Sequence, residues 1–313
     1  MNQVFLWRLI EKAILILNRI ILKNGFQITY SVIKLKQEKQ GASIRKNYGP
    51  SDVTIAIQGP LTNPIIIEES VSRYLENFGN IGIVVSTWND DPALNRLELP
   101  HQVQLILNAP PKTAGISNLN FQALSTIRSL EWAESNGFKF TLKLRSDQHL
   151  FSNVAIDRLL ERHKHIKNSK YLRIVTTDFN SFLFRPYSPS DQLMFSDTRT
   201  LRNFWQSYDG EDKSKQSSDD FAEKILLKSY MKYLGIPFHN TITQSLELYR
   251  DLYAFIDNED LGLHWFKGTQ RSLRSRFPQD QYPTLESFVR FSDWLNLQTS
   301  LNSYLDAYES LYS

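Results

Sequence analysis

The chain has 313 residues, enough for one large domain or two small ones with a sizeable core. It contains no cysteine, which excludes disulfides, thiolate nucleophiles and cysteine metal sites. The net charge of +3 is uneven: residues 1–50 hold 9 Lys and Arg against 2 Asp and Glu, or +7, which leaves −4 for the remainder. A basic arm on a mildly acidic body favours an anionic surface as the partner of the arm. Basic and aromatic residues do not interleave across the body, so we expect no nucleic acid as a partner.

The first 23 residues are strongly apolar, but charged residues interrupt them. Arg8, Glu11, Lys12 and Arg19 keep every apolar run below the roughly 20 residues that a membrane span needs. On a helix these charges form one narrow polar stripe, which predicts an amphipathic N-terminal helix. Such a helix can lie in a membrane interface, with the basic residues of segment 1–46 near anionic lipid. A helix packed on the domain or on a second subunit explains the pattern equally well.

Short strands and helices alternate from about Asp52 onward. Apolar runs predict strands over 53–57, 82–86 and 103–107. Helical spacing predicts one helix that starts with Pro64 at its first position and another after the loop that ends at Asn120. Residues 138–144 alternate apolar with polar side chains, which is typical of a half-buried strand. The order predicts an α/β fold with a mostly parallel central sheet flanked by helices.

The second half of the chain has weaker signals. We expect a helix over 154–165, a strand over 171–176, an extended aromatic segment over 179–187, an apolar run over 193–195, a polar loop over 210–218 that could act as a lid, and a helix over 219–234 capped by Asp219 or Asp220. The last thirty residues read as helical. The predicted organisation is a basic arm and linker (1–50), a body (51–270) and a helical C-terminal part (271–313).

Polar residues follow the predicted strands of the first half at their carboxyl ends, where ligands bind in open α/β sheets. These loops are Gln58–Thr62, Ser86–Asp91, Asn108–Asn120 and Arg145–His149. In the last loop a cation and a carboxylate, Arg145 and Asp147, can together handle phosphate and a metal ion, so Asp147 is a candidate ligand for Mn²⁺ or Mg²⁺. A surface ion pair, or a metal-free site in which Arg145 carries the charge, are the alternatives.

Four further residues are candidates for chemistry. Asp191 stands between aromatic-rich segments, as a sugar-hydroxyl ligand would, although its segment Ser188–Asp191 can also be a plain turn. Glu223 is a candidate base, or simply a charge that complements a helix N-terminus. His264 and Lys267 are candidates for phosphate contact, although His264 can equally be a buried structural histidine. Dinucleotide-binding, P-loop, HExxH and GxSxG signatures are absent from the sequence.

Several short motifs follow one another in a definite order over about 180 residues. They are Ile57-Gln58-Gly59-Pro60, Ser86-Thr87-Trp88, Ile106-Leu107-Asn108, Asn118-Leu119-Asn120-Phe121-Gln122, Leu142-Lys143-Leu144-Arg145-Ser146-Asp147, Pro189-Ser190-Asp191 and Ala222-Glu223. In this order the chain resembles the WavE lipopolysaccharide-synthesis family of bacterial glycosyltransferases. The resemblance covers residues 52–234 and implies a GT-A-like fold, with Arg-Ser-Asp in the place of a metal-binding Asp-x-Asp motif.

The resemblance also implies a function. A nucleotide-activated sugar is expected to be transferred to a glycan or lipid-linked glycan of lipopolysaccharide or capsule, at the cytoplasmic face of the inner membrane. Asp191, Glu223 and Asp147 are the implied catalytic residues. The implied donor-binding residues are Gln58, Gly59, Pro60, Thr62, Ser86, Thr87, Trp88, Asn120 and Arg145. His264 and Lys267 lie outside the resemblance and join this set as the candidates for phosphate contact named above. A phosphotransferase or nucleotidyltransferase, and a membrane-tethered glycan-binding subunit without activity, are the alternative hypotheses.

Overall fold

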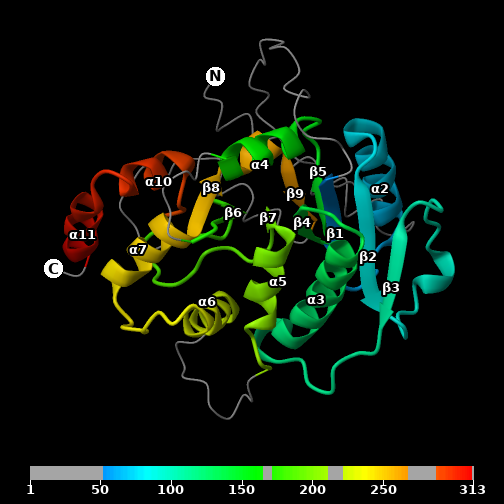
Figure 1. Cartoon of the computed structure of the whole chain (residues 1–313), viewed down its shortest axis with the longest axis horizontal. Coiled ribbons are helices and arrows are strands. Elements are labelled where there is room, and N and C mark those ends of the chain that lie inside the picture. The colour runs from blue at the N-terminus through cyan, green and yellow to red at the C-terminus, as the bar shows by residue number, and fades with distance from the viewer. Residues whose placement is uncertain (1–51, 165–170, 211–220, 267–286, 312–313) are drawn as a thin grey trace, which may run out of the picture. The chain divides into compact units, whose positions relative to one another are not determined.

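The structure is a computed structural model that describes residues 52–164, 171–210, 221–266 and 287–311 (Figure 1). The predicted N-terminal helix, the polar loop over 211–218, the site residue Lys267 and the expected boundary at 270/271 lie outside these residues. The helix expected over 219–234 begins at Ala222, and its N-cap is Phe221, so the expected cap by Asp219 or Asp220 is wrong. Among the described residues, no helix combines the length and the apolar composition that crossing a membrane requires.

Seven strands of the described chain form one central sheet in the order β3-β2-β1-β4-β7-β6-β8. Strand β7 runs antiparallel to both of its neighbours, and all other neighbouring strands are parallel. The strands are β1 (Val53–Gln58), β2 (Gly82–Trp88), β3 (Gln104–Asn108), β4 (Phe140–Arg145), β6 (Ile174–Thr177), β7 (Met194–Asp197) and β8 (Tyr253–Ile256). The expected mostly parallel α/β sheet is therefore confirmed. A second sheet pairs β5 (Gln148–Leu150) with β9 (Leu263–Trp265).

Helices cover both faces of the central sheet. The described helices are α2 (Pro64–Phe78), α3 (Leu119–Ser135), α4 (Ala155–Lys164), α5 (Thr198–Gln206), α6 (Ala222–Tyr233), α7 (Ile242–Leu252), α8 (Asn258–Leu261), α10 (Phe291–Leu297) and α11 (Leu301–Ser310). Helices α3 and α5 lie side by side in front of the sheet in Figure 1. Side chains of β4 point alternately to the two faces of the sheet. On one face Lys143 contacts Trp205 of α5, and on the other face Phe140 contacts His163 of α4.

Local sequence signals explain several helix starts. Pro64 stands at the first position of α2, where its missing N–H costs nothing. The side chain of Asp197 accepts a hydrogen bond from the backbone N–H of Thr200 and caps α5. Thr241 caps α7 in the same way by accepting from the backbone N–H of Gln244. Each cap satisfies a backbone donor that the helix itself cannot pair.

Two expectations about the strands are wrong. Strand β4 is not half-buried, because Thr141 and Lys143, its polar positions, are both fully buried. The strand lies between β1 and β7 and is covered on both faces, which the alternating sequence does not reveal. Residues 179–187 are not extended either: Asn180 and Tyr187 have φ values of 66° and 61°, in the left-handed region, and the segment turns.

The C-terminal part packs on the β8 edge of the sheet (Figure 1). The indole N–H of Trp294 in α10 donates to the backbone carbonyl of Tyr253 at 2.8 Å. The expected helical character of the C-terminal residues is confirmed by α10 and α11. Helix α7 and strand β8, which the sequence did not predict, supply the surface on which these helices pack.

Candidate functional site at the carboxyl edge of the sheet

All four predicted loops leave the sheet at one edge, because β1, β2, β3 and β4 run parallel. The parallel register places Gln58 of β1 between Ser86 of β2 and Arg145 of β4. The fourth loop follows β3, whose last residue, Asn108, pairs with Trp88. Because parallel strands end on the same side, the loops that carry the candidate residues meet there.

The turn after β1 is held by its neighbours on both sides. Gly59 has a φ of 122°, a conformation that side chains rarely adopt, and a Cβ atom there would lie 2.8 Å from Oγ of Ser146. The hydroxyl of Ser146 donates to the backbone carbonyl of Pro60 at 2.8 Å. Oδ2 of Asp91 accepts from the backbone N–H of Leu61 at 2.7 Å, so the loop after β2 holds the same turn. Close approach of the β1 and β4 turns therefore requires glycine at position 59.

Arg145 and Asp147 form a bidentate ion pair. Nε of Arg145 donates to Oδ1 of Asp147 at 2.9 Å, and Nη2 donates to Oδ2 at 3.0 Å. The guanidinium carbon lies 5.8 Å from the ring centre of Trp265 in β9. Burial opposes the charge of Arg145, but the hydrogen bond and the charge of Asp147 outweigh burial and raise the arginine pKa. The remaining N–H donors of the guanidinium can contact an anionic group.

The described residues around Asp147 do not fit a divalent metal ion. Both of its carboxylate oxygens already accept from Arg145. Across the described ranges, no three His, Asp or Glu side chains gather closely enough to hold an ion. Mg²⁺ and Mn²⁺ bind through several oxygen ligands, and here the nearest partner of Asp147 is a cation. The site therefore offers positive charge from the protein in the position where a metal ion was expected.

Lys143 is the charged residue of this site that the sequence did not predict. Its side chain is 0 % exposed and its ammonium lies 4.9 Å from the ring centre of Trp205. Burial lowers its pKa to about 8, although the negative charge of Asp191 raises it. The alternation of residues 138–144 suggested a solvent-facing lysine, and only the position of β4 inside the sheet buries it.

Asp191 lies in the turn before β7 and belongs to the same group of charges. Its backbone carbonyl accepts a hydrogen bond from Nζ of Lys143. Its side chain is 5 % exposed, and Oδ2 is buried with no hydrogen-bond partner among the described residues. Gln148 links this turn to the end of β4, since it accepts from the backbone N–H of Arg145 at 3.1 Å and donates to Gln192 at 3.0 Å. The turns that carry Asp191 and Arg145 are thus joined through one side chain.

Glu223 is in the first turn of α6, as expected, and it also acts on this group. Oε1 of Glu223 accepts from the side-chain amide of Asn180 at 3.1 Å. Its negative charge raises the pKa of Lys143, as do those of Asp191 and Asp147. The three carboxylates that the sequence proposed as catalytic therefore all favour the charged form of Lys143, a buried lysine that the sequence did not single out.

The residues expected to bind the donor differ in accessibility. Pro60 and Thr62 are exposed, whereas Gln58 and Gly59 are buried. The side-chain carbonyl of Gln58 accepts from Ser125 of α3 at 2.9 Å. Asn120 is half-buried and already bonded, because it donates to Thr113 and accepts from Tyr208 at 2.6 Å.

The three candidates at the end of β2 are all buried. Ser86 accepts from the side chain of Asn108 at 2.8 Å, and Thr87 is fully buried. Trp88 packs edge-on against Phe121, with ring centres 4.8 Å apart. These buried side chains support the edge of the sheet from within. The groups accessible to a ligand are therefore the turn that carries Pro60 and Thr62, and Arg145.

His264 lies in the small sheet beneath the Arg145 turn. It is buried, pairs across the strands with His149, and its ring lies 4.6 Å from that of Phe266. The neighbouring backbone N–H of Phe266 donates to the carbonyl of Asp147 at 3.0 Å, so β9 supports the turn that carries the ion pair. His264 thus contributes to the packing under the site.

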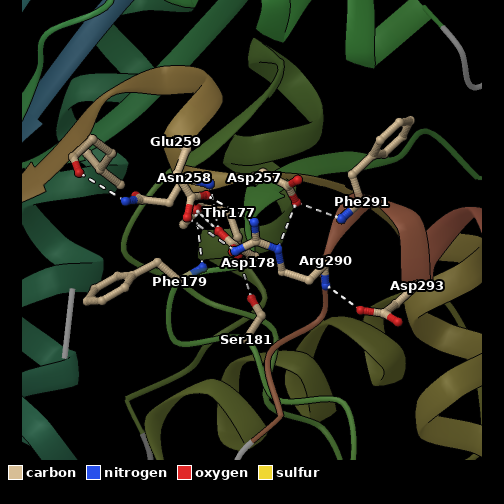
Figure 2. Close-up of polar contacts among 11 residues, drawn as sticks. Thr177, Asp178, Phe179, Ser181, Asp257, Asn258, Glu259, Arg290, Phe291 and Asp293 are labelled. Atoms are coloured by element: carbon tan, nitrogen blue, oxygen red, sulfur yellow. Dashed lines mark hydrogen bonds and ion pairs between the residues drawn. The ribbon is translucent and has the colours of Figure 1, made fainter. Parts of the chain in front are cut away.

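A second charge cluster, built around the buried Asp178, stands at the carboxyl ends of β6 and β8. Figure 2 shows Arg290 between Asp178, which follows β6, and the acidic residues Asp257 and Glu259, which follow β8. Nη1 of Arg290 donates to Oδ2 of the fully buried Asp178 at 2.7 Å. Burial raises the pKa of Asp178 to about 8, although Arg290 lowers it. The sequence contained no local signal for this cluster, because Arg290 and Asp178 are 112 positions apart.

Comparison with models of known protein families finds no match to this chain, and comparison with curated proteins finds no match either. The resemblance to the WavE family therefore rests on the short motifs themselves and stays a prediction.

Proposed function

We propose that the protein is a glycosyltransferase that moves a sugar from a nucleotide-activated donor to a hydroxyl group of a growing bacterial surface polysaccharide, either lipopolysaccharide or capsule. The observation that carries the proposal is the carboxylate of Asp191. It is buried beside Lys143, and its Oδ2 atom accepts no hydrogen bond from any described residue. An unsatisfied buried polar group costs about 1–3 kcal/mol, and catalytic groups are among those in which this cost is found. A substrate hydroxyl is the donor that suits this position.

The proposed reaction uses the two joined turns. The acceptor hydroxyl gives its proton to Asp191 as its oxygen forms a bond to the anomeric carbon of the donor sugar. The bond between that carbon and the phosphate oxygen breaks, and the nucleoside diphosphate leaves with the electron pair. Arg145, held by Asp147, meets the charge that develops on the departing phosphates. Glu223 is the second candidate for orienting the acceptor.

The donor is proposed to lie across the turn Gln58–Thr62, with its phosphates toward Arg145. The exposure of Pro60 and Thr62 and the half-buried position of Asn120 support this direction. In this proposal the protein's own cation replaces the Mn²⁺ or Mg²⁺ expected at Asp147, because both oxygens of that carboxylate are engaged by Arg145. No step of the reaction is assigned to a metal ion.

The acceptor is proposed to be a glycan or lipid-linked glycan at the cytoplasmic face of the inner membrane. The basic, amphipathic sequence of residues 1–46 supports this location, since it suits an anionic membrane surface. The protein would then be a peripheral membrane protein.

A thermal-shift screen of nucleotides and nucleotide sugars, each with and without Mn²⁺ or Mg²⁺, tests donor binding. A ligand at 100 times its Kd stabilises the folded state by about 2.7 kcal/mol. We expect a shift with one nucleotide family that does not depend on the metal ion. A shift that appears only with metal would indicate that a metal ion at Asp147, and not Arg145 alone, binds the phosphates.

Turnover of the donor found in that screen tests the catalytic assignment. Asp191→Asn should lower kcat by about 10²–10⁴-fold and leave the nucleotide-induced shift unchanged, because it removes a base and not a donor contact. Asp147→Asn releases Arg145 from its bidentate partner and should also lower turnover, whereas its matched control Asp251→Asn, which breaks the same kind of pair with Arg250 in α7, should not. Undiminished turnover in Asp191→Asn would refute the assignment.

The products separate the rival functions. A product that carries phosphate would identify a phosphotransferase or nucleotidyltransferase. Binding of glycans without binding of any nucleotide would identify a non-enzymatic glycan-binding subunit.

A further inference from the structure

Lys143 is a charged side chain in the middle of the sheet, and the reaction proposed above does not use it. It occupies β4 between Ala56 of β1 and Met194 of β7, and its side chain is fully buried. Removing an ammonium group from water is unfavourable unless partners in the protein compensate for the loss. The surroundings of Lys143 therefore indicate why a lysine stands at this position.

Two groups contact the ammonium directly. It donates to the backbone carbonyl of Asp191, and it stands 4.9 Å from the ring centre of Trp205, whose face attracts a cation. The first contact joins the middle of β4 to the turn before β7. This contact therefore ties β4 to the residue that is the candidate base, Asp191.

The charges that face Lys143 are predominantly negative. Asp191, Asp147 and Glu223 favour its protonated form, while Arg145 disfavours it. Burial brings its pKa down to about 8, so the side chain is mostly an ammonium ion at neutral pH and loses its charge in the mildly alkaline range. Among these charges, Asp191 contributes most to keeping Lys143 protonated.

We propose that Lys143 is a positioning residue for Asp191. Its ammonium fixes the turn through the Asp191 carbonyl, and this contact leaves Oδ2 of the carboxylate open to a substrate hydroxyl. The catalytic part of this inference rests on the proposed function, whereas the pairing of Lys143 with Asp191 does not. The two parts are tested separately for that reason.

A double-mutant cycle in chemical denaturation tests the pairing without any substrate. Lys143→Met keeps the length of the side chain and removes the charge, and Asp191→Asn removes the opposite charge. We expect the two changes to be coupled by a factor of about 10 or more in the unfolding equilibrium constant, with the double variant more stable than the single changes predict. Lys224→Met is the matched control, because Lys224 is 9 % exposed and faces the ring of Phe238 instead. Its coupling to Asp191→Asn should be near 1.

Kinetics test the positioning role. Lys143→Met should lower kcat by about 10²-fold, the lower range for loss of a poised base, with an unchanged nucleotide-induced thermal shift. The kcat profile of the wild type should fall above about pH 8, as Lys143 loses its proton. In Lys143→Arg that fall should move up by at least one pH unit, because arginine stays charged. If Lys143→Arg does not fold, Lys143→Met decides the question alone.

The two results can disagree in an informative way. Coupling near 1 between positions 143 and 191 would overturn the pairing whatever the protein catalyses. Coupling as expected, together with an unchanged kcat and pH profile in Lys143→Met, would overturn the positioning role. If no sugar transfer is detected, the proposed function fails and the denaturation cycle still decides the pairing.

Discussion

Replacement of Arg290 by methionine tests how the C-terminal segment is attached to the sheet. Arg290 precedes α10 and inserts its guanidinium between carboxylates that follow β6 and β8 (Figure 2). Methionine keeps much of the apolar length of the side chain and removes the charge. Asp178, which is 0 % exposed, would then lose its cationic partner.

The expected loss of stability follows from the contacts. Breaking a buried ion pair by removing one partner costs about 3–5 kcal/mol. The lower end applies here, because Asp178 still accepts from the backbone N–H of Asn258 at 2.7 Å and from Thr177 at 3.1 Å. The outer contacts, to Asp257 at 3.6 Å and Glu259 at 3.2 Å, are partly exposed and contribute about 1 kcal/mol or less each. We expect a total loss of about 3 kcal/mol, or roughly 6–12 °C in Tm.

Urea unfolding at pH 9, above the raised pKa of Asp178 so that its carboxylate is ionised, followed by tryptophan fluorescence, measures this loss. Arg250→Met is the control, since Arg250 forms its bidentate pair with Asp251 at the surface and should cost less than about 1 kcal/mol. Adding Asp178→Asn to Arg290→Met should recover part of the stability, because the uncompensated carboxylate is then absent. If Arg290→Met unfolds within 1 kcal/mol of the wild type, as the control does, the cluster does not clamp the segment and the reasoning is refuted.

Three further predictions concern single side chains. Burial raises the pKa of Asp178 to about 8 in the folded chain, against about 3.9 in the unfolded chain, so the stability from its neutral form is complete below pH 4 and is lost as pH rises through 8. In the wild type, this effect should lower the unfolding free energy by up to about 1.4 kcal/mol per pH unit between pH 5 and 8, and Asp178→Asn should remove the decline in urea titrations. An unchanged slope in Asp178→Asn would contradict the raised pKa. Gly59→Ala should cost about 1–3 kcal/mol in the same assay, because alanine at a φ of 122° is strained and its Cβ meets Ser146; a neutral effect would show that the turn can relax. Tyr74→Phe removes the hydroxyl that accepts from the backbone N–H of Leu150 at 3.0 Å, and it should cost about 1–3 kcal/mol and speed hydrogen exchange at that amide, whereas wild-type exchange would mean that the bond is not needed.

The first half of the fold was predictable from local patterns. Strands β1, β2 and β3 and helices α2 and α3 follow from short apolar runs, helical spacing and the proline at the start of α2. Each of these signals lies within the segment that it specifies. Strand β8 and helix α7 were missed, because their contacts are with distant parts of the chain. Strand β8 pairs with β6, and both elements pack against α10.

The edge that carries the candidate site was predictable for a similar reason. Parallel strands end on the same side of a sheet, so the loops after β1, β2 and β4 had to meet once the strands were identified. The meeting of Arg145 and Asp147 was also predictable, since two positions separate them along the chain.

The sequence by itself therefore determined the strands and helices of the first half, the edge where its loops meet and the residue types available there. Only the tertiary structure decided the charges: it buried Lys143 against Trp205, set its ammonium on the carbonyl of Asp191, and brought Arg290 to Asp178. The physical reason is the range of the interactions. Hydrophobic periodicity acts over one helix or strand, whereas burial and pairing of charges depend on which elements pack together across the whole sheet.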